Sequence, residues 1–245
     1  EYTSAFLKSI QEIGFVDPIF GFTKPDQVSI DGENYRETIS AHGHNARIRA
    51  ILRIFTDEML SRGPSARVYA PESLTSFADT LRMLPPDFVG SEYLPTVLER
   101  ARHPGVLHQD VMNLSFEDAA FDLYITCEVL EHVPDIRAKL RESRRVLKSG
   151  GKLIGTFPFH YGSYQSHTKA ILKDGQIVHL TEPEYHGNPA DPAGGSLVFT
   201  IPGWEVVEWA KEAGFSNAYF VASGSRLHAI RAAELAVVLA FVAEA

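Results

Sequence analysis

The sequence predicts an α/β protein with a doubly wound, mostly parallel sheet, and one central segment carries the main evidence. Residues 121–126 form a short β-branched and aromatic run with few charges, as expected of a strand buried on both faces. Over residues 136–147 the apolar positions change to helical spacing, with charged residues around them. Gly150 and Gly151 then favour the end of a helix, and residues 153–157 return to a strand-like pattern. Strand, helix and strand in this order form a βαβ unit, which builds parallel sheets.

The remaining elements extend this alternation in both directions. Apolar spacing and turn residues predict, in chain order, a strand at 66–70, a helix at 74–84, a strand at 88–91, a helix at 94–102 and a strand at 106–108. Towards the end of the chain we expect a helix at 204–213 and strands at 218–222 and 235–242. Alternating strands and helices are typical of a doubly wound sheet.

The domain organisation follows from where this pattern starts and where it is interrupted. Residues 1–63 lie before the first predicted strand and include an amphipathic helix near 46–60, so we expect an N-terminal helical cap or lid. Residues 64–245 form the main domain. A turn-rich insertion at 158–201 is too long for a plain connection, and insertions of this kind often carry function.

Composition excludes several classes of function. The chain has 245 residues and a net charge of -8, so we expect no nucleic acid and no anionic membrane surface as partner. Cys127 is the only cysteine, which rules out an intramolecular disulfide and a thiolate zinc site and fits a cytoplasmic protein. His42 and His44 lie in one loop without further ligands, and we predict no metal. The sequence leaves a homodimer open.

Polar residues follow the predicted strands at the edge where ligands of such sheets bind. Glu92 lies about 20 residues beyond the first strand, where an acidic residue grips a ribose diol, and Tyr93 is its neighbour. Cys127, Glu128, Glu131 and His132 follow the strand at 121–126, and His160 follows the strand at 153–157. Candidates for an acceptor pocket are Tyr161, Tyr164, Tyr185 and His186, although each equally suits a loop rich in hydrogen-bonding aromatic residues.

Two strings within this region, FDLYITCEVLEHV and RVLKSGGKLIGTFPF, resemble the fourth-strand to fifth-strand region of class I S-adenosylmethionine-dependent methyltransferases. The resemblance implies a Rossmann-like, seven-stranded sheet and S-adenosylmethionine as cofactor. It also implies that Asp110 holds the adenine amino group beside Val111, and that Cys127 and Glu128 lie where cofactor and substrate meet.

The chain departs from the family pattern in the loop after its first strand. Class I methyltransferases place a glycine-rich turn there, since glycine lets the backbone approach the cofactor closely. This chain has RVYAPESLTSF, with no glycine between Arg67 and Phe77. We expect Glu72 to supply the carboxylate of that loop.

The predicted function is methyl transfer to a small-molecule acceptor, most simply at oxygen. A general base is needed where the acceptor carries a proton, and His132 and His160 are the candidates. His132 also fits a structural role, because E-H-V is common in this fold. Alternatively, the chain has the methyltransferase fold but binds a ligand or partner without transferring a methyl group. The missing glycine-rich loop favours this alternative. A nicotinamide-dependent oxidoreductase fits less well, because that fold also needs the glycine-rich turn.

Overall fold

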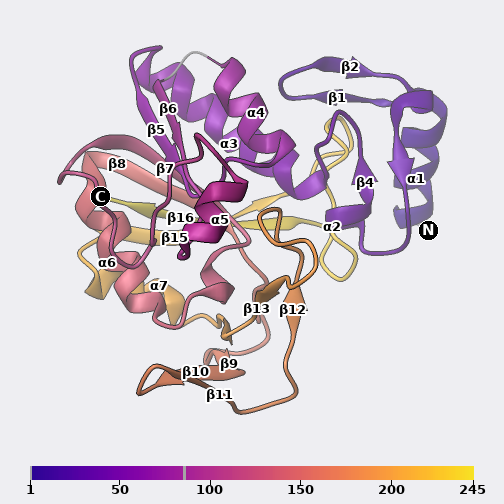
Figure 1. Ribbon diagram of the computed structural model, residues 1–245. Helices are drawn as coiled ribbons and strands as arrows, with labels where there is room; N and C mark the ends of the chain where they lie inside the picture. The colour runs from indigo at the N-terminus through magenta and orange to yellow at the C-terminus, as the bar shows by residue number, and fades with distance from the viewer. Residues whose placement is uncertain (1, 85–86) are drawn as a thin grey trace. The chain divides into compact units, whose positions relative to one another are not determined.

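The computed structural model describes residues 2–84 and 87–245, which divide into two compact units (Figure 1). Unit 1 comprises Glu1–Pro64 and Phe220–Ala240, and unit 2 comprises Ser65–Tyr219 and Phe241–Ala245. Every residue that the sequence predicts for the cofactor site lies in unit 2. The predicted cap, residues 1–63, falls within unit 1, and its role as a lid stays a prediction.

A mixed sheet of six strands is the centre of the fold. Its strands, in spatial order, are β15 (Asn217–Ser223), β16 (Val238–Glu244), β8 (Leu147–Thr156), β7 (Phe121–Cys127), β5 (Arg67–Ala70) and β6 (Asp87–Gly90). Strands β6, β5, β7 and β8 run parallel, and β16 runs antiparallel to β8. The predicted α/β class with a mostly parallel sheet is therefore confirmed.

The predicted count of seven strands is not confirmed. Residues 106–108 were expected to form a strand, but in the described chain they contribute only an isolated parallel bridge between Glu92 and His108. Around this bridge the Glu92 amide donates to the Leu107 carbonyl, and the Gln109 amide donates to the Glu92 carbonyl. This segment therefore lies beside the residue that follows β6, but it pairs at one position only and is too short to count as a strand.

Strand β7 lies in the middle of the parallel part of the sheet. It pairs with β5 on one side and β8 on the other, and only Asp122 among its seven residues is not buried. A strand covered on both faces needs apolar residues at consecutive positions, which is the pattern that predicted it.

The predicted helix end at Gly150 and Gly151 is wrong. Helix α6 (Ile136–Val146) ends four residues earlier, and both glycines lie inside β8. Phe121 pairs with Leu147 but Leu123 pairs with Lys152, so β8 bulges between these pairs. Gly150 supplies the left-handed conformation of the bulge, with φ of 74°. Glycine residues mark bulges in strands as well as helix ends, and the sequence does not distinguish the two.

The helices described in unit 2 are α4 (Ser76–Met83), α5 (Val97–Arg102), α6 and α7 (Val206–Glu212), with α6 and α7 side by side (Figure 1). Helix α4 contacts β6 and helix α6 contacts β8, whereas none of the residues of α5 is buried. Short strand pairs build the insertion, namely β9 (His167–Thr168) with β14 (Thr200–Ile201), β10 (Ala170–Lys173) with β11 (Gln176–His179), and β12 (Tyr185–His186) with β13 (Ser196–Leu197).

Unit 1 contains helices α1 (Tyr2–Ile13), α2 (Tyr35–Thr38) and α3 (Ala46–Arg62). Its strand pairs are β1 (Phe15–Asp17) with β2 (Gly21–Thr23) and β3 (Ser29–Ile30) with β4 (Ile39–Ser40), and a short 3₁₀ turn, η1 (Pro25–Gln27), precedes β3. The buried guanidinium of Arg49 donates to the carbonyls of Ile39, His44, His228 and Ala229, so α3 ties together distant segments of this unit. None of the helices in the described residues has both the length and the apolar character that a membrane span requires.

Candidate functional site

The predicted site residues follow the carboxyl ends of four parallel strands, which meet at one edge of the sheet. Glu72 lies in the loop after β5, Glu92 follows β6, Cys127 ends β7, and His160 follows β8. The topology therefore brings together residues that are separated by up to 88 positions in the sequence.

Glu92 is the best-defined side chain at this edge. It is only 9% exposed, and its Oε1 accepts hydrogen bonds from the amides of Ser73 (2.8 Å) and Leu74 (3.0 Å). Burial raises the pKa of Glu92, and the two amide hydrogen bonds oppose that rise. Within the described chain no hydrogen bond reaches Oε2, which is the oxygen that a ligand would meet.

The loop after β5 packs directly against the end of β6. A Cβ atom added to Gly90 would lie 2.7 Å from the carbonyl oxygen of Glu72 and 2.7 Å from Oγ of Ser73, closer than real Cβ contacts. Gly90 therefore lets the loop pack closely against β6, which is a different close approach from the one to the cofactor that the glycine-rich turn of the family permits. The Glu72 carboxylate accepts a hydrogen bond from the Thr75 hydroxyl, which also caps α4 by accepting from the Ala78 amide.

Tyr93 and Asp110 form a second group beside Glu92. The Tyr93 ring is exposed and lies 5.7 Å from the His108 ring, centroid to centroid. Burial raises the pKa of Tyr93, and the negative charges of Asp110 and Glu99 raise it further. Asp110 Oδ1 accepts from the Met112 amide, and Val111 between them is buried.

Cys127 and Glu128 lie at the end of β7. The Cys127 side chain is buried, and the Glu128 amide donates to the Thr156 carbonyl of β8. Glu128 has φ of 52°, a left-handed conformation that is uncommon outside glycine and costs energy. The helical turn η2 covers Leu130–His132, so Glu128 lies before it and His132 lies within it.

The two candidate bases differ in their surroundings. His132 Nδ1 lies 2.9 Å from the carbonyl oxygen of Leu197 and donates its proton there, since a carbonyl only accepts. His160 is exposed near the start of the insertion, and its amide donates to the carbonyl of Pro202, just after the insertion ends. The insertion therefore contains His160 and contacts His132 through the Leu197 carbonyl.

Residues that the sequence analysis did not single out complete this region. Glu184, in the insertion, accepts from His186 Nε2 (3.0 Å) and from Lys169. Lys139 of α6 is fully buried, and burial lowers its pKa to about 7 while the charge of Glu131 opposes the drop. A lysine among the charged positions of a helix reads as solvent-facing in sequence, so no local signal points to its burial.

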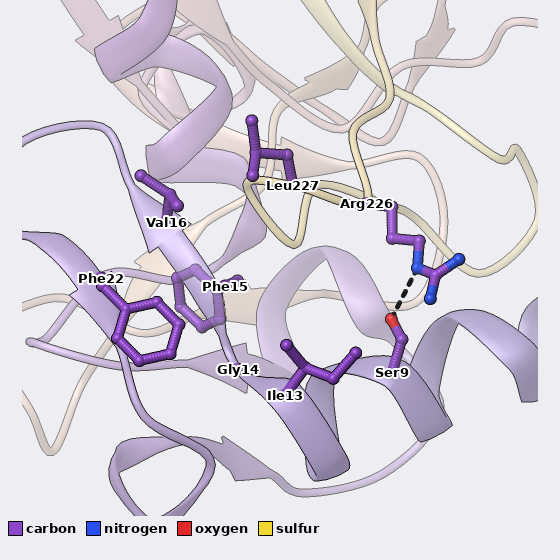
Figure 2. Close-up of a pocket in the computed structure, with 8 residues that line it drawn as sticks. All are labelled: Ser9, Ile13, Gly14, Phe15, Val16, Phe22, Arg226 and Leu227. Atoms are coloured by element: carbon purple, nitrogen blue, oxygen red, sulfur yellow. Dashed lines mark hydrogen bonds between the residues drawn. The ribbon is translucent and has the colours of Figure 1, made fainter.

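One shallow, mostly apolar pocket lies outside this region, in unit 1 (Figure 2). Among its lining side chains, Arg226 Nε donates to Ser9 Oγ (2.9 Å), and the rest of the lining comes from Ile13, Gly14, Phe15, Val16, Phe22 and Leu227. None of the predicted site residues contributes to it.

Comparisons with known proteins agree with the fold. Residues 75–155 match the family described as "Methyltransferase domain", which confirms the predicted resemblance to class I S-adenosylmethionine-dependent methyltransferases. The demethylmenaquinone methyltransferase of Staphylococcus saprophyticus is 34% identical over 121 residues, which cover 46% of this chain and 49% of that protein. The enzyme of the same name from Staphylococcus haemolyticus is 43% identical over 98 residues, covering 36% of this chain and 41% of that protein. The chain thus spans about half the length of these relatives or less.

Two solved structures share the fold at low sequence identity. An S-adenosylmethionine-dependent methyltransferase from Mesorhizobium loti superposes with a TM-score of 0.51 at 15% identity, over 82% of this chain and 98% of that one. An amino pentose methyltransferase from Micromonospora echinaspora, involved in calicheamicin biosynthesis and solved with S-adenosylmethionine bound, gives 0.50 at 16% identity, over 82% and 92%. Similarity at this level establishes an α/β methyltransferase fold.

Proposed function

We propose that this chain, which contains a class I methyltransferase domain, transfers the methyl group of S-adenosylmethionine to an oxygen atom of a small-molecule acceptor. One observation carries the proposal: Glu92, a buried carboxylate held by two backbone amides, lies after the second parallel strand of a sheet whose fold is that of methyltransferases. A carboxylate at this position suits a ribose diol, because both hydroxyl groups can donate to it.

The other residues at this edge fit the remaining parts of the cofactor. Asp110 is a hydrogen-bond acceptor for an exocyclic amino group, and the exposed Tyr93 ring beside it offers an apolar face for a purine. Bound S-adenosylmethionine supplies an electrophilic methyl group on a sulfonium. The protein has to position the acceptor in line with that group and take up a proton where the acceptor loses one.

His160 is our first choice for the proton acceptor. It is exposed at the end of β8, whereas the Nδ1 proton of His132 is committed to the Leu197 carbonyl. His132 remains a proposed alternative through its Nε2 atom. Cys127 and Glu128 stay proposals for the place where cofactor and acceptor meet.

Isothermal titration calorimetry with S-adenosylhomocysteine tests the assignment of the site. We expect Glu92→Gln and Asp110→Asn each to weaken binding by about 1.5 kcal/mol, roughly tenfold, because each removes a charge-assisted hydrogen bond. Glu117→Gln is the matched control, since Glu117 is exposed on the same unit, and its affinity should equal that of the wild type. Equal affinities for all four proteins would show that the carboxylates of Glu92 and Asp110 do not bind the nucleoside.

A second candidate function is ligand or partner binding on a methyltransferase fold without methyl transfer. The loop after β5 favours it, because the amides of Ser73 and Leu74 already donate to Glu92 and are not directed at a cofactor. Folded protein that gives no heat with either S-adenosylmethionine or S-adenosylhomocysteine would favour this second function.

A further inference from the structure

The turn after β7 and the insertion bring together a carboxylate and two imidazoles. Glu131 and His132 belong to η2, and His186 belongs to β12, 54 positions later in the chain. One ligand-capable atom from each of the three lies within 4.8 Å of the others. All three residues are in unit 2.

Glu131 lacks the hydrogen bonds that a buried carboxylate requires. Its side chain is 0% exposed, and neither Oε1 nor Oε2 accepts a hydrogen bond from the described residues. Burying an ionised carboxylate without hydrogen bonds costs several kcal/mol, so such groups are normally paired with cations or bound to a metal. The groups closest to Glu131 that could play this part are the two imidazoles and the amine of Lys139. The buried amine of Lys139 acts on Glu131 only as a nearby charge, since it donates no hydrogen bond to either oxygen.

The two distances from Glu131 to the imidazoles match metal coordination better than direct hydrogen bonds. Glu131 Oε1 lies 3.4 Å from His132 Nε2 and 3.5 Å from His186 Nδ1. A charge-assisted N–H···O bond would be about 2.7–2.9 Å long. Tetrahedral coordination with metal–ligand bonds of about 2.0–2.2 Å places neighbouring ligand atoms roughly 3.3–3.6 Å apart.

The outer nitrogen of each imidazole is already held by an oxygen acceptor. His132 Nδ1 donates to the Leu197 carbonyl (2.9 Å), and His186 Nε2 contacts Oε1 of Glu184 (3.0 Å). This arrangement directs the lone pair of His132 Nε2, and that of His186 Nδ1 in its neutral form, towards Glu131. Metal-binding histidines typically show this pattern, in which a carbonyl or carboxylate fixes the tautomer of the ring.

We propose that Glu131, His132 and His186 bind a divalent first-row transition metal, for which Zn²⁺ is the best fit. Two imidazole nitrogens and one carboxylate oxygen suit zinc and leave a fourth coordination position. The side chains of His132 and His186 are 15% and 30% exposed, so that position opens on the histidine side of the cluster. The metal would fasten the insertion to the turn after β7. This inference does not depend on the proposed methyl transfer. A metal bound to His132 Nε2 would leave His160 as the proposed proton acceptor.

Zinc binding by the full chain tests the site. After dialysis against a chelator, we expect the wild type to take up one equivalent of Zn²⁺, measured by titration and by metal analysis. His186→Gln and Glu131→Gln should each reduce the affinity at least about 100-fold, and Glu184→Gln about 10-fold to 100-fold through the orientation of His186. His179→Gln is the matched control, because His179 is exposed on β11 of the same insertion, and it should bind as the wild type does.

X-ray absorption spectroscopy of the wild-type zinc complex tests the site without relying on variants that could fail to fold. Two imidazoles in the first coordination shell are the expected result. The proposal would be overturned if the wild type takes up no zinc, if His186→Gln binds zinc as tightly as the wild type, or if the coordination shell contains no imidazole. A protonated His186 between Glu131 and Glu184 would then explain why these side chains lie together.

Discussion

Gly90 shows how a single missing side chain positions the loop of the candidate cofactor site. Any Cβ at this residue would meet the Glu72 carbonyl oxygen and Ser73 Oγ at 2.7 Å. We expect Gly90→Ala to lower the free energy of unfolding by about 1–3 kcal/mol, as overpacking does, and to weaken S-adenosylhomocysteine binding through Glu92. Gly162→Ala is the control, since a Cβ there meets nothing within 4 Å. Urea unfolding of both variants measures the difference, and equal stability would contradict the packing described here.

Asp17 of unit 1 gives a prediction about pH. Burial alone would raise its pKa, but the neighbouring His44 ring, 3.6 Å away, and the amides of Ile19 and Phe20 outweigh burial and hold the pKa below 3.8. A carboxyl group with a lowered pKa in the folded state stabilises the protein above its unfolded pKa. That stabilisation is lost as the pH falls through the folded value.

Asp17→Asn tests this linkage, because asparagine keeps an oxygen that can accept from the same two amides. Between pH 6 and pH 3, the wild type should lose more unfolding free energy than Asp17→Asn does. Asp26→Asn, at an exposed position of the same unit, should follow the wild type. A variant at Asp17 with the pH dependence of the wild type would show that this carboxylate does not contribute to acid sensitivity.

Among the elements, helix α6 depends on its N-terminal cap. Asp135 accepts a hydrogen bond from the Ala138 amide at 2.9 Å, which satisfies one of the free donors of the first turn. Replacing it with alanine should cost about 1 kcal/mol in unfolding free energy and leave nucleoside affinity unchanged. Thermal unfolding alongside Glu117→Ala measures this effect, and a variant as stable as the control would argue against the cap.

Elements with strong local patterns were predictable from the sequence. Strand β7 and helix α6 are examples, because the spacing of their apolar residues follows directly from which face each element buries. The bulge at Gly150 was not predictable, because a glycine with positive φ fits a helix end and a strand bulge equally well. The sequence also could not predict that residues 106–108 form a single bridge instead of a strand, because this depends on how they pair with Glu92.

The candidate site also has a part that the sequence could predict and a part that it could not. The position of Glu92 at the end of β6 could be predicted from its offset to the first strand, because the topology of parallel sheets fixes where such residues meet. Its role towards a ribose stays a prediction. The cluster of Glu131 and His186 could not be predicted, because it depends on how a turn-rich insertion folds back onto η2. The Phe199 amide donates to the Glu131 carbonyl, a contact between residues with no periodic relation in sequence.

At the scale of the whole molecule, unit 2 combines a sheet of the methyltransferase fold with an insertion, and we assign a different proposed site to each. The sheet edge at Glu92 is the proposed place for the cofactor, and the insertion supplies His186 to the proposed metal site and also contains His160. We expect the nucleoside to bind at that edge of the sheet.

The most direct test is a crystal structure of the chain with S-adenosylhomocysteine. We predict that the ribose hydroxyl groups lie within hydrogen-bond distance of the Glu92 carboxylate, with the adenine beside Tyr93 and Asp110. A nucleoside bound elsewhere, with Glu92 still accepting only from the amides of Ser73 and Leu74, would contradict binding of the cofactor at this edge.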